Sequence, residues 1–68
     1  MGRWGYTVLV LSEVNGSVIR CEELFNTQSS AQRYAAKLHS DTNNVSLEES
    51  AASVRNGDSL YKVTMIMY

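Results

Sequence analysis

The sequence predicts a small α+β domain in which a three-stranded, antiparallel-type sheet of order 2-1-3 carries one or two helices on one face, as ββαβ or ββααβ. Three observations support this prediction. Two apolar runs flank Asn15-Gly16, a helical periodicity follows them, and an alternating run closes the chain. Because 68 residues suffice for one domain and not for two, 1–68 is treated as a single domain.

The segment 6–25 is predicted to be a β-hairpin. Its first run, 6–11, is apolar and rich in β-branched residues, which suit a buried pleated surface. Asn-Gly tolerates positive φ at two successive positions, as the type I′ turn of a two-residue hairpin loop requires. That loop would place Tyr6 opposite Phe25, whereas a three-residue loop would shift the register of the second strand.

Both faces of the first strand are apolar. In the two-residue register, one face of the hairpin carries Tyr6, Val8, Val10, Ile19, Cys21 and Phe25. The opposite face carries Thr7, Leu9, Leu11, Val18 and Leu24, with Glu13, Arg20 and Glu22 among them. A hairpin with one wet face would alternate apolar and polar residues. We therefore expect the first strand to be central in the sheet, with both of its faces at least partly covered.

A helix is predicted over 28–39. Thr27 precedes it as an N-cap, because its side-chain oxygen can accept a hydrogen bond from a free amide of the first turn. The apolar residues recur at the i, i+3, i+4, i+7 spacing of an amphipathic helix. They are Ala31, Tyr34, Ala35 and Leu38. The turn formers at 41–44 are expected to end the helix.

The segment 47–56 has two interpretations. Ser46 followed by Glu49 matches a capping box, and Gly57 suits the position after a helix end, so a second short helix is favoured. The alternative is a second hairpin that turns at Asn56-Gly57, with 52–55 as a short strand.

The last strand is predicted over 60–68 by an alternating pattern. Its core-facing residues are Tyr61, Val63, Met65 and Met67, and its other face carries Lys62, Thr64, Ile66 and Tyr68. It would lie beside the first strand, antiparallel to it, as an edge of the sheet. Because Lys62 is its one charged residue, this edge could pair with a second copy or accept a partner strand.

One helical layer covers one sheet face, so apolar residues remain on the other face. They are Leu9, Leu11, Val18, Ile66 and Tyr68, with Leu24 beside them. A large exposed apolar patch is unusual on a monomer and marks an interaction site. We expect this face to pack against a second copy, giving a homodimer, or against a different protein. The alternative is that the long side chains of Arg20, Glu22 and Lys62 shield it.

The first residues, 1–5, are expected to be a frayed lead-in. Trp4 is the exception, because a tryptophan buries a large area and is expected to cap one end of the core. The alternative is that Arg3 and Trp4 together form a binding hot spot, where both residue types are enriched.

No pattern in the sequence points to catalysis, a cofactor or a metal. Cys21 and His39 are the only residues of their types and lie on different predicted elements. Cys21 is expected to be a small buried hydrophobe, and His39 a cation at the helix end. The chain has no glycine-rich phosphate loop and no nucleophile elbow. We therefore expect a protein that is not an enzyme.

The charge is nearly balanced, with six basic and seven acidic residues. The basic residues are scattered, which argues against tight binding of a phosphate backbone. The alternative function is a stacking platform for single-stranded nucleic acid. It would be built from Tyr6, Tyr61 and Tyr68 with Arg20 and Lys62. A single cysteine, no signal-peptide pattern and no apolar run long enough for a membrane favour a cytoplasmic protein without a membrane partner.

Together these observations favour a small non-enzymatic protein-binding module that acts as a homodimer. Its size, its lack of proline and its lack of a catalytic set are similar to those of accessory proteins of bacteriophages and mobile elements. Several such proteins bind and block a host enzyme or defence factor, so this resemblance of size and composition implies an inhibitor in the host cytoplasm. The remaining alternative is a structural subunit of a larger assembly.

Overall fold

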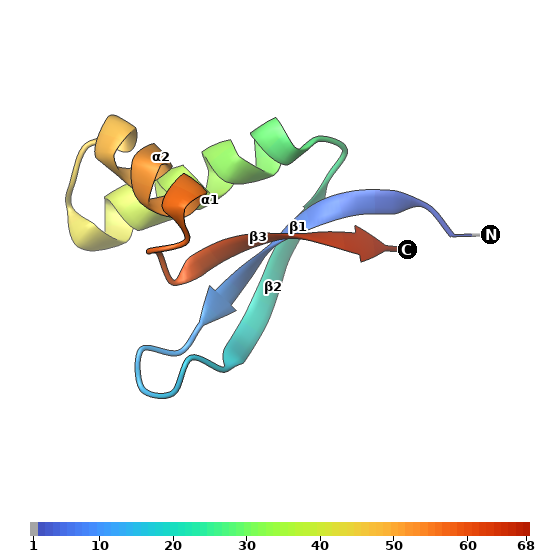
Figure 1. The fold of residues 1–68 in the computed structure, drawn as a ribbon, viewed down its shortest axis with the longest axis horizontal. Helices are drawn as coiled ribbons and strands as arrows, with labels where there is room; N and C mark the ends of the chain where they lie inside the picture. The colour runs from blue at the N-terminus through green and yellow to red at the C-terminus, as the bar shows by residue number, and fades with distance from the viewer. Residues whose placement is uncertain (1) are drawn as a thin grey trace.

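The computed structural model describes residues 2–68. Its elements are β1 (Trp4–Leu11), β2 (Val18–Phe25), α1 (Gln28–Asn43), α2 (Leu47–Asn56) and β3 (Tyr61–Met67). The strands form one antiparallel 3-stranded sheet in the order β2-β1-β3, and both helices lie on the same side of it (Figure 1). The predicted α+β class, strand order and ββααβ arrangement are confirmed.

The core forms where α1 lies over the sheet. Val8 of β1 is fully buried together with Ala31 and Ala35 of α1. The partly buried residues that pack around them are Tyr6, Phe25, Tyr34, Leu38, Val54, Tyr61 and Val63. Small alanine side chains let the helix approach the sheet closely, and the predicted amphipathic spacing of this helix is confirmed. α2 packs on α1 and reaches the sheet only at β3.

α1 begins where the sequence predicts and ends later. The Thr27 hydroxyl accepts a hydrogen bond from the Ser30 amide at 3.2 Å, which confirms the N-cap. The helix then continues to Asn43, past the predicted end at 39. Asn44 ends it in the left-handed conformation, with φ of 56°. The expected earlier stop is wrong because turn-forming residues only weakly oppose a helix, whereas a left-handed cap terminates it.

α2 has the predicted bounds, 47–56. The Ser46 hydroxyl accepts from the Glu49 amide at 3.2 Å, and Gly57 ends the helix with φ of 77°. The first turn carries Glu48 and Glu49, whose charges suit the positive end of the helix dipole. The alternative of a second hairpin over this segment is wrong.

The loop between β1 and β2 is longer than the two-residue turn expected from Asn15-Gly16. The Ser12 amide donates to Ser17 O at 2.8 Å, and the Gly16 amide donates to Ser12 O at 2.9 Å. Gly16 has positive φ but Asn15 does not. Instead, the Asn15 side-chain oxygen accepts from the amide and hydroxyl of Ser17, at 3.0 and 2.7 Å. This local bonding replaces the type I′ geometry.

The register of β2 also differs from the expectation. Tyr6 lies opposite Phe25 as predicted, but the pairing is irregular between Tyr6 and Val8 and again between Val10 and Leu11. The residues actually opposite one another are Val8 and Glu22, Leu9 and Cys21, Val10 and Arg20, and Leu11 and Val18. Cys21 therefore lies on the face away from the helices, and Arg20 and Glu22 lie on the helix-facing side. Both placements reverse the prediction, because each bulge moves the following side chains to the other face.

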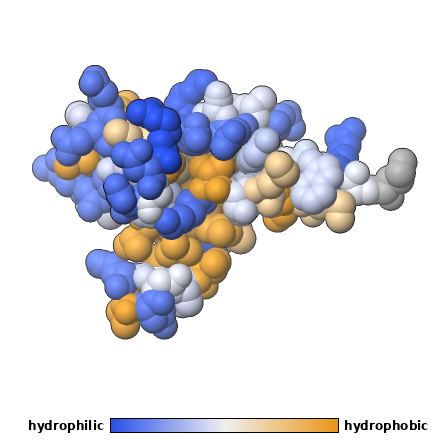
Figure 2. Space-filling view, viewed as in Figure 1, coloured by the Kyte–Doolittle hydropathy of each residue, from blue (hydrophilic) through white to orange (hydrophobic). Residues whose placement is uncertain are grey.

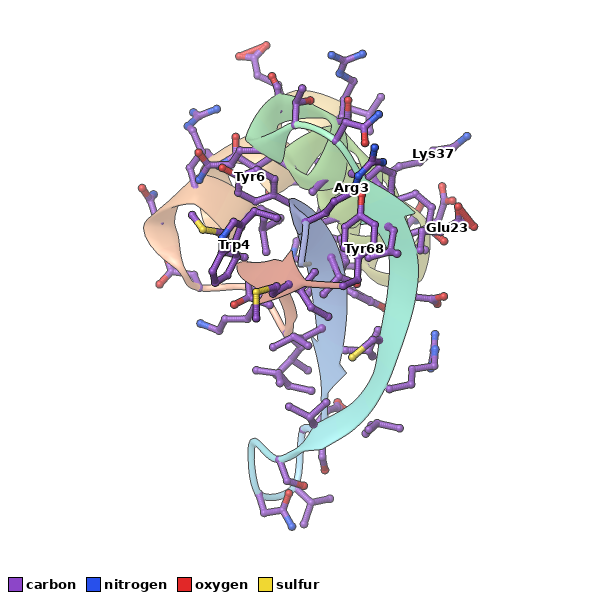
Figure 3. All side chains as sticks on the ribbon, turned by 90° about the vertical axis from the view of Figure 1, so that its right-hand side faces the viewer. Arg3, Trp4, Tyr6, Glu23, Lys37 and Tyr68 are labelled. Carbon is purple, nitrogen blue, oxygen red and sulfur yellow. The ribbon has the colours of Figure 1, made fainter. Side chains whose placement is uncertain are left out.

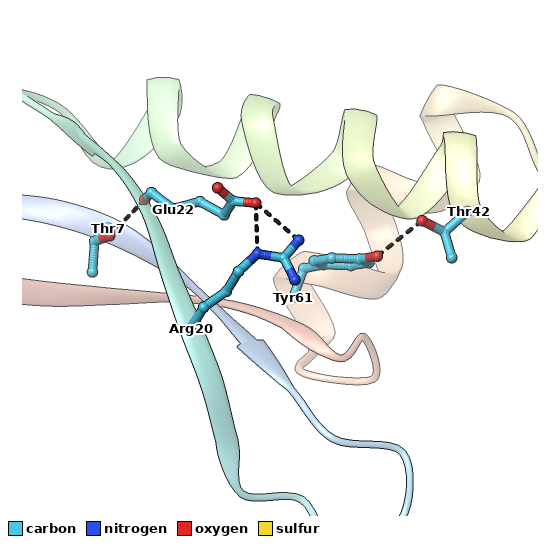
Figure 4. Close-up of polar contacts among 5 residues, drawn as sticks. All are labelled: Thr7, Arg20, Glu22, Thr42 and Tyr61. Atoms are coloured by element: carbon cyan, nitrogen blue, oxygen red, sulfur yellow. Dashed lines mark hydrogen bonds and ion pairs between the residues drawn. The ribbon is translucent and has the colours of Figure 1, made fainter.

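The first irregularity lies at Glu23, whose φ is 42°. The Thr7 hydroxyl of β1 donates to the carbonyl oxygens of Glu22 and Glu23, each 2.7 Å away; Figure 4 draws the first of these bonds. At the second irregularity, Ile19 has no partner in the ladder and is exposed, although the sequence placed it on the core face.

From Arg3 onward the chain pairs with the last strand, so the frayed lead-in expected over 1–5 is wrong for residues 3–5; Met1 lies outside the described residues. Arg3 and Tyr68 exchange backbone hydrogen bonds of 2.7 and 2.8 Å, one residue beyond the ends of β1 and β3. β3 runs antiparallel to β1 with Trp4 opposite Met67 and Val10 opposite Tyr61. The predicted alternation of its two faces is confirmed, but only Tyr61 and Val63 pack against the core; Met65 and Met67, which were expected there, are more than half exposed because they lie beyond the helices.

Candidate interaction surface

Within the described part of the chain, residues 2–68, both helices lie on one face of the sheet; we call the other face the open face. It is set by the alternation of side chains along β1 and by the residues paired with them. Its larger apolar residues are Leu9, Leu11, Val18, Cys21, Leu24, Ile66 and Tyr68. All five residues that the sequence marked as interface residues, including Leu9 and Leu11 of β1, are therefore on one face. Cys21 was missed because no residue in the sequence marks the bulges.

At the centre of the open face the side chain of Thr7 is buried, whereas the side chains nearer its margins are exposed to solvent. Thr7 is only 2% exposed, because its hydroxyl bonds to β2 and its neighbours flank it. Val18, Leu24 and Tyr68 are 53%, 51% and 47% exposed, and Leu9 is partly buried. A shallow hollow of about 460 Å³ lies over this part of the face. It is lined by Thr7, Cys21, Leu24, Ile66 and Tyr68, and also by the acidic residues Glu22 and Glu23.

Of the three long polar side chains that were the alternative shield, two lie on the other side of the sheet, and the third, Lys62, is on the open face opposite Leu9. Arg20 and Glu22 lie on the helix-facing side, where Arg20 Nε and Nη2 are each 3.0 Å from Glu22 Oε1 (Figure 4). The Lys62 ammonium donates to Gly57 O at 2.6 Å, at the end of α2. Arg20 and Glu22 therefore do not shield the open face, and of the three residues only the Lys62 stem remains beside Leu9.

Apolar side chains also reach the surface elsewhere on the sheet. Figure 2 shows hydrophobic side chains gathered over the sheet and hairpin, whereas the outer surface of the helices is mostly hydrophilic. Three residues of the helix-facing side lie beyond the N-terminal end of α1. They are Trp4, Met65 and Met67, which are 65%, 57% and 59% exposed. The prediction that Trp4 caps the core is therefore wrong: the helices do not extend over it.

Arg3 and Trp4, the residues of the predicted hot spot, lie on opposite faces of the sheet. Successive residues of a strand point to opposite faces, so Trp4 shares its side of β1 with Tyr6, while Arg3 lies opposite Tyr68. Figure 3 shows Trp4 and Tyr6 on one side of the strand and Tyr68 on the other. Trp4 is thus grouped with Met65 and Met67 on the helix-facing side, and Arg3 is on the other side of the sheet.

The structure does not assemble the tyrosine platform either. Tyr6 and Tyr61 face the helices and pack against the core. The Tyr61 hydroxyl lies 2.8 Å from Thr42 Oγ1 of α1 (Figure 4). Tyr68 is on the open face, so the three rings are divided between the two sides of the sheet. Of the two cations predicted for this platform, Arg20 is paired with Glu22 and Lys62 bonds to Gly57 O.

The two residues considered for chemistry are placed differently from the expectation. Cys21 is exposed on the open face, not buried. His39 is not at the helix end, because α1 continues to Asn43. Its Nδ1 lies 2.8 Å from the hydroxyl of Ser50, a fully buried residue of α2, so this contact joins the two helices.

Within residues 2–68, no group of three or more His, Cys, Asp or Glu side chains gathers as metal ligands would. Neither described helix has the length and apolar character needed to cross a bilayer. Comparison with family models, with curated proteins and with solved structures found no match to this chain.

Proposed function

We propose that this chain is a small non-enzymatic protein-binding module whose partner docks on the open face. The observation that carries the proposal is that neither helix of residues 2–68 covers this apolar face, because α1 and α2 both lie on the other side of the sheet. Arg20 and Glu22 pair with each other on the opposite side, and Lys62 bonds to Gly57. The side chains at its margins, such as Val18 and Tyr68, remain about half exposed.

The energy available from covering the face is large enough to support association. At about 25 cal/mol per Å², burial of roughly 400 Å² of apolar surface contributes about 10 kcal/mol before the costs of association. Two occupants fit: a second copy packed back to back as a homodimer, or a different protein. From the resemblance in size and composition to phage and mobile-element accessory proteins, we propose a cytoplasmic host enzyme or defence factor, inhibited by binding, as the different protein.

The test compares two surface substitutions. Leu9→Lys places a charge in the open face, and Val14→Lys places the same charge in the exposed hairpin loop. Sedimentation velocity over a range of concentrations measures self-association, and capture by tagged protein from a lysate of the source cells measures partner binding. We expect Leu9→Lys to lose one of these activities and Val14→Lys to keep both. Unchanged association and capture in a folded Leu9→Lys variant would contradict the proposal.

A further inference from the structure

The two edges of the sheet are protected very differently. Natural proteins block free strand edges with bulges, charges or covering segments. The β2 edge has two irregularities in its pairing, positive φ at Glu23 and the Arg20–Glu22 ion pair. β3, by contrast, pairs with β1 over its 7 residues without irregularity and carries one charged residue, Lys62. The β3 edge is therefore regular and largely uncharged.

The hydrogen-bond pattern shows which backbone groups of β3 point outward. Arg3 and Tyr68 exchange both of their backbone hydrogen bonds. Hydrogen-bonded and non-hydrogen-bonded pairs alternate along an antiparallel ladder, so the even-numbered residues of β3 bond to β1. The odd-numbered residues direct their N–H and C=O groups away from the sheet. Beyond the start of the strand, these residues are Val63, Met65 and Met67.

At the start of the β3 edge the outward backbone groups already have hydrogen-bond partners within the chain, whereas farther along they do not. The outward Tyr61 amide donates to the Ser59 hydroxyl at 3.0 Å, and Lys62 bonds to Gly57 beside it. α2 also contacts β3. Among residues 2–68, no hydrogen bond reaches the outward backbone groups of 63–67. The free length of the edge is thus the second half of β3.

The side chains along this free length are apolar on both sides of the sheet. Met65 and Met67 are more than half exposed on the helix-facing side, and Ile66 lies on the open face. Methionine adapts its shape to a neighbouring surface and is common at interaction sites. A strand added here would satisfy the free backbone groups and cover these methionines in the same step.

We propose that the β3 edge pairs antiparallel with β3 of a second copy across a two-fold axis, which joins the two 3-stranded sheets into one continuous sheet. A second copy fits this edge because two identical strands related by a two-fold axis are antiparallel. Every hydrogen bond from the first copy to the second is then repeated from the second copy to the first. Its strand is also already extended, so it avoids the entropic cost that a flexible foreign segment would incur on ordering. The axis is perpendicular to the sheet, so both helical layers lie on one side and the two open faces join on the other. This inference does not depend on the open face being a docking site.

The first test is a cysteine scan along the proposed axis. In a Cys21→Ser background, Thr64→Cys, Met65→Cys and Ile66→Cys are oxidised separately, with Val14→Cys in the loop as the control. Only a residue on the two-fold axis meets its own copy within the Cα separation of about 4.4–6.8 Å that a disulfide needs. We expect one of the three positions to give severalfold more linked dimer than the control. Equal yields at all three positions and at Val14 would overturn the inference.

The second test uses proline, which removes a backbone donor. The outward amide of Met65 has no hydrogen-bond partner among residues 2–68, so Met65→Pro is expected to fold and to lose the dimer in sedimentation velocity. Retention of the dimer by folded Met65→Pro would contradict edge pairing. Loss of the dimer in Leu9→Lys but not in Met65→Pro would also contradict it, while supporting docking on the open face. A wild-type protein that stays monomeric at all concentrations would likewise overturn the inference.

Discussion

The ring of Tyr68 lies directly over Gly5 on the neighbouring strand. A Cβ atom added at Gly5 would come within 2.8 Å of Tyr68 Cε1 and 3.0 Å of the Phe25 carbonyl oxygen. The last residue of the chain therefore packs on the open face beside β1, and the glycine leaves room for it. Gly5 is buried for this reason although it lies near the chain's first residue.

This contact predicts that Gly5→Ala destabilises the protein. Alanine normally stabilises a strand relative to glycine, but here its methyl group would overpack against a ring and a carbonyl. We expect a loss of about 1–2 kcal/mol in the free energy of unfolding, measured by urea denaturation. In a Tyr68→Ala background the same substitution should cost less, because the ring is gone. Equal costs in the two backgrounds would contradict the contact.

A second prediction concerns the hydroxyl of Thr7, which bonds to two carbonyl oxygens at the bulge in β2. Thr7→Val keeps the shape and removes the donor, so two carbonyl groups beside a buried residue lose their partner. The expected cost is about 1–3 kcal/mol in the free energy of unfolding. Thr7→Ser keeps the hydroxyl and is the matched control, with a smaller loss. If the Thr7→Val protein proved as stable as the Thr7→Ser protein, the hydroxyl would have no role in holding the bulge.

Replacing Glu23 by glycine should stabilise the folded protein. Its φ of 42° is in the left-handed region, which costs a residue with a side chain about 1–2 kcal/mol. We expect Glu23→Gly to raise the free energy of unfolding by about 0.5–1 kcal/mol, because glycine adopts this conformation freely. Glu22→Gly, one residue earlier in ordinary strand conformation, should instead lower it. Thermal unfolding of both variants decides the matter, and a destabilised Glu23→Gly protein would speak against the bulge.

The raised pKa of Tyr34 leads us to predict that the protein loses stability at alkaline pH. Desolvation raises the pKa of its hydroxyl above 10.0, and the negative charges of Glu22 and Glu23 raise it further, against the opposing charge of Arg20. Because the folded protein holds this proton more tightly, the stabilisation is complete below pH 10.0 and is lost as the pH rises through the folded-state pKa.

The measurement is the free energy of unfolding in urea at about pH 8 and about pH 11, for the wild-type protein and for Tyr34→Phe. We expect the wild-type value to fall more steeply between the two pH values, because phenylalanine has no proton to lose. Phe25 packs against the ring of Tyr34 at a centroid distance of 5.2 Å, a contact that phenylalanine can keep. Parallel slopes for the two proteins would show that Tyr34 is not responsible.

The fold and most of the open face could be predicted from the sequence because they depend on periodicity. Leu9 and Leu11 share one side of a strand whatever the loop does, and Val8 and Val10 share the other. The helix caps Thr27 and Ser46 were also predictable, since each is a hydroxyl at the start of an amphipathic segment.

The register of β2 could not be predicted, because bonds distant in sequence determine it. A glutamate such as Glu23 gives no sign of positive φ, and the bulge there is held by Thr7 from another strand. The Asn15-Gly16 signal was overridden by side-chain bonds to Ser17. The position of Cys21 on the open face follows from these two features and was therefore missed.

The central claim is that the open face is uncovered in the single folded chain, and a soluble paramagnetic probe tests it most directly by NMR. The probe broadens the methyl signals of side chains that solvent can reach, and Val8 is the buried reference and Val14 the exposed one. In dilute protein we predict broadening of the Leu9, Leu11 and Ile66 methyl signals between those of the two references, and protection of these methyls when a partner or second copy docks. Leu9 and Leu11 methyls as protected as those of Val8 in the dilute, monomeric protein would contradict the account.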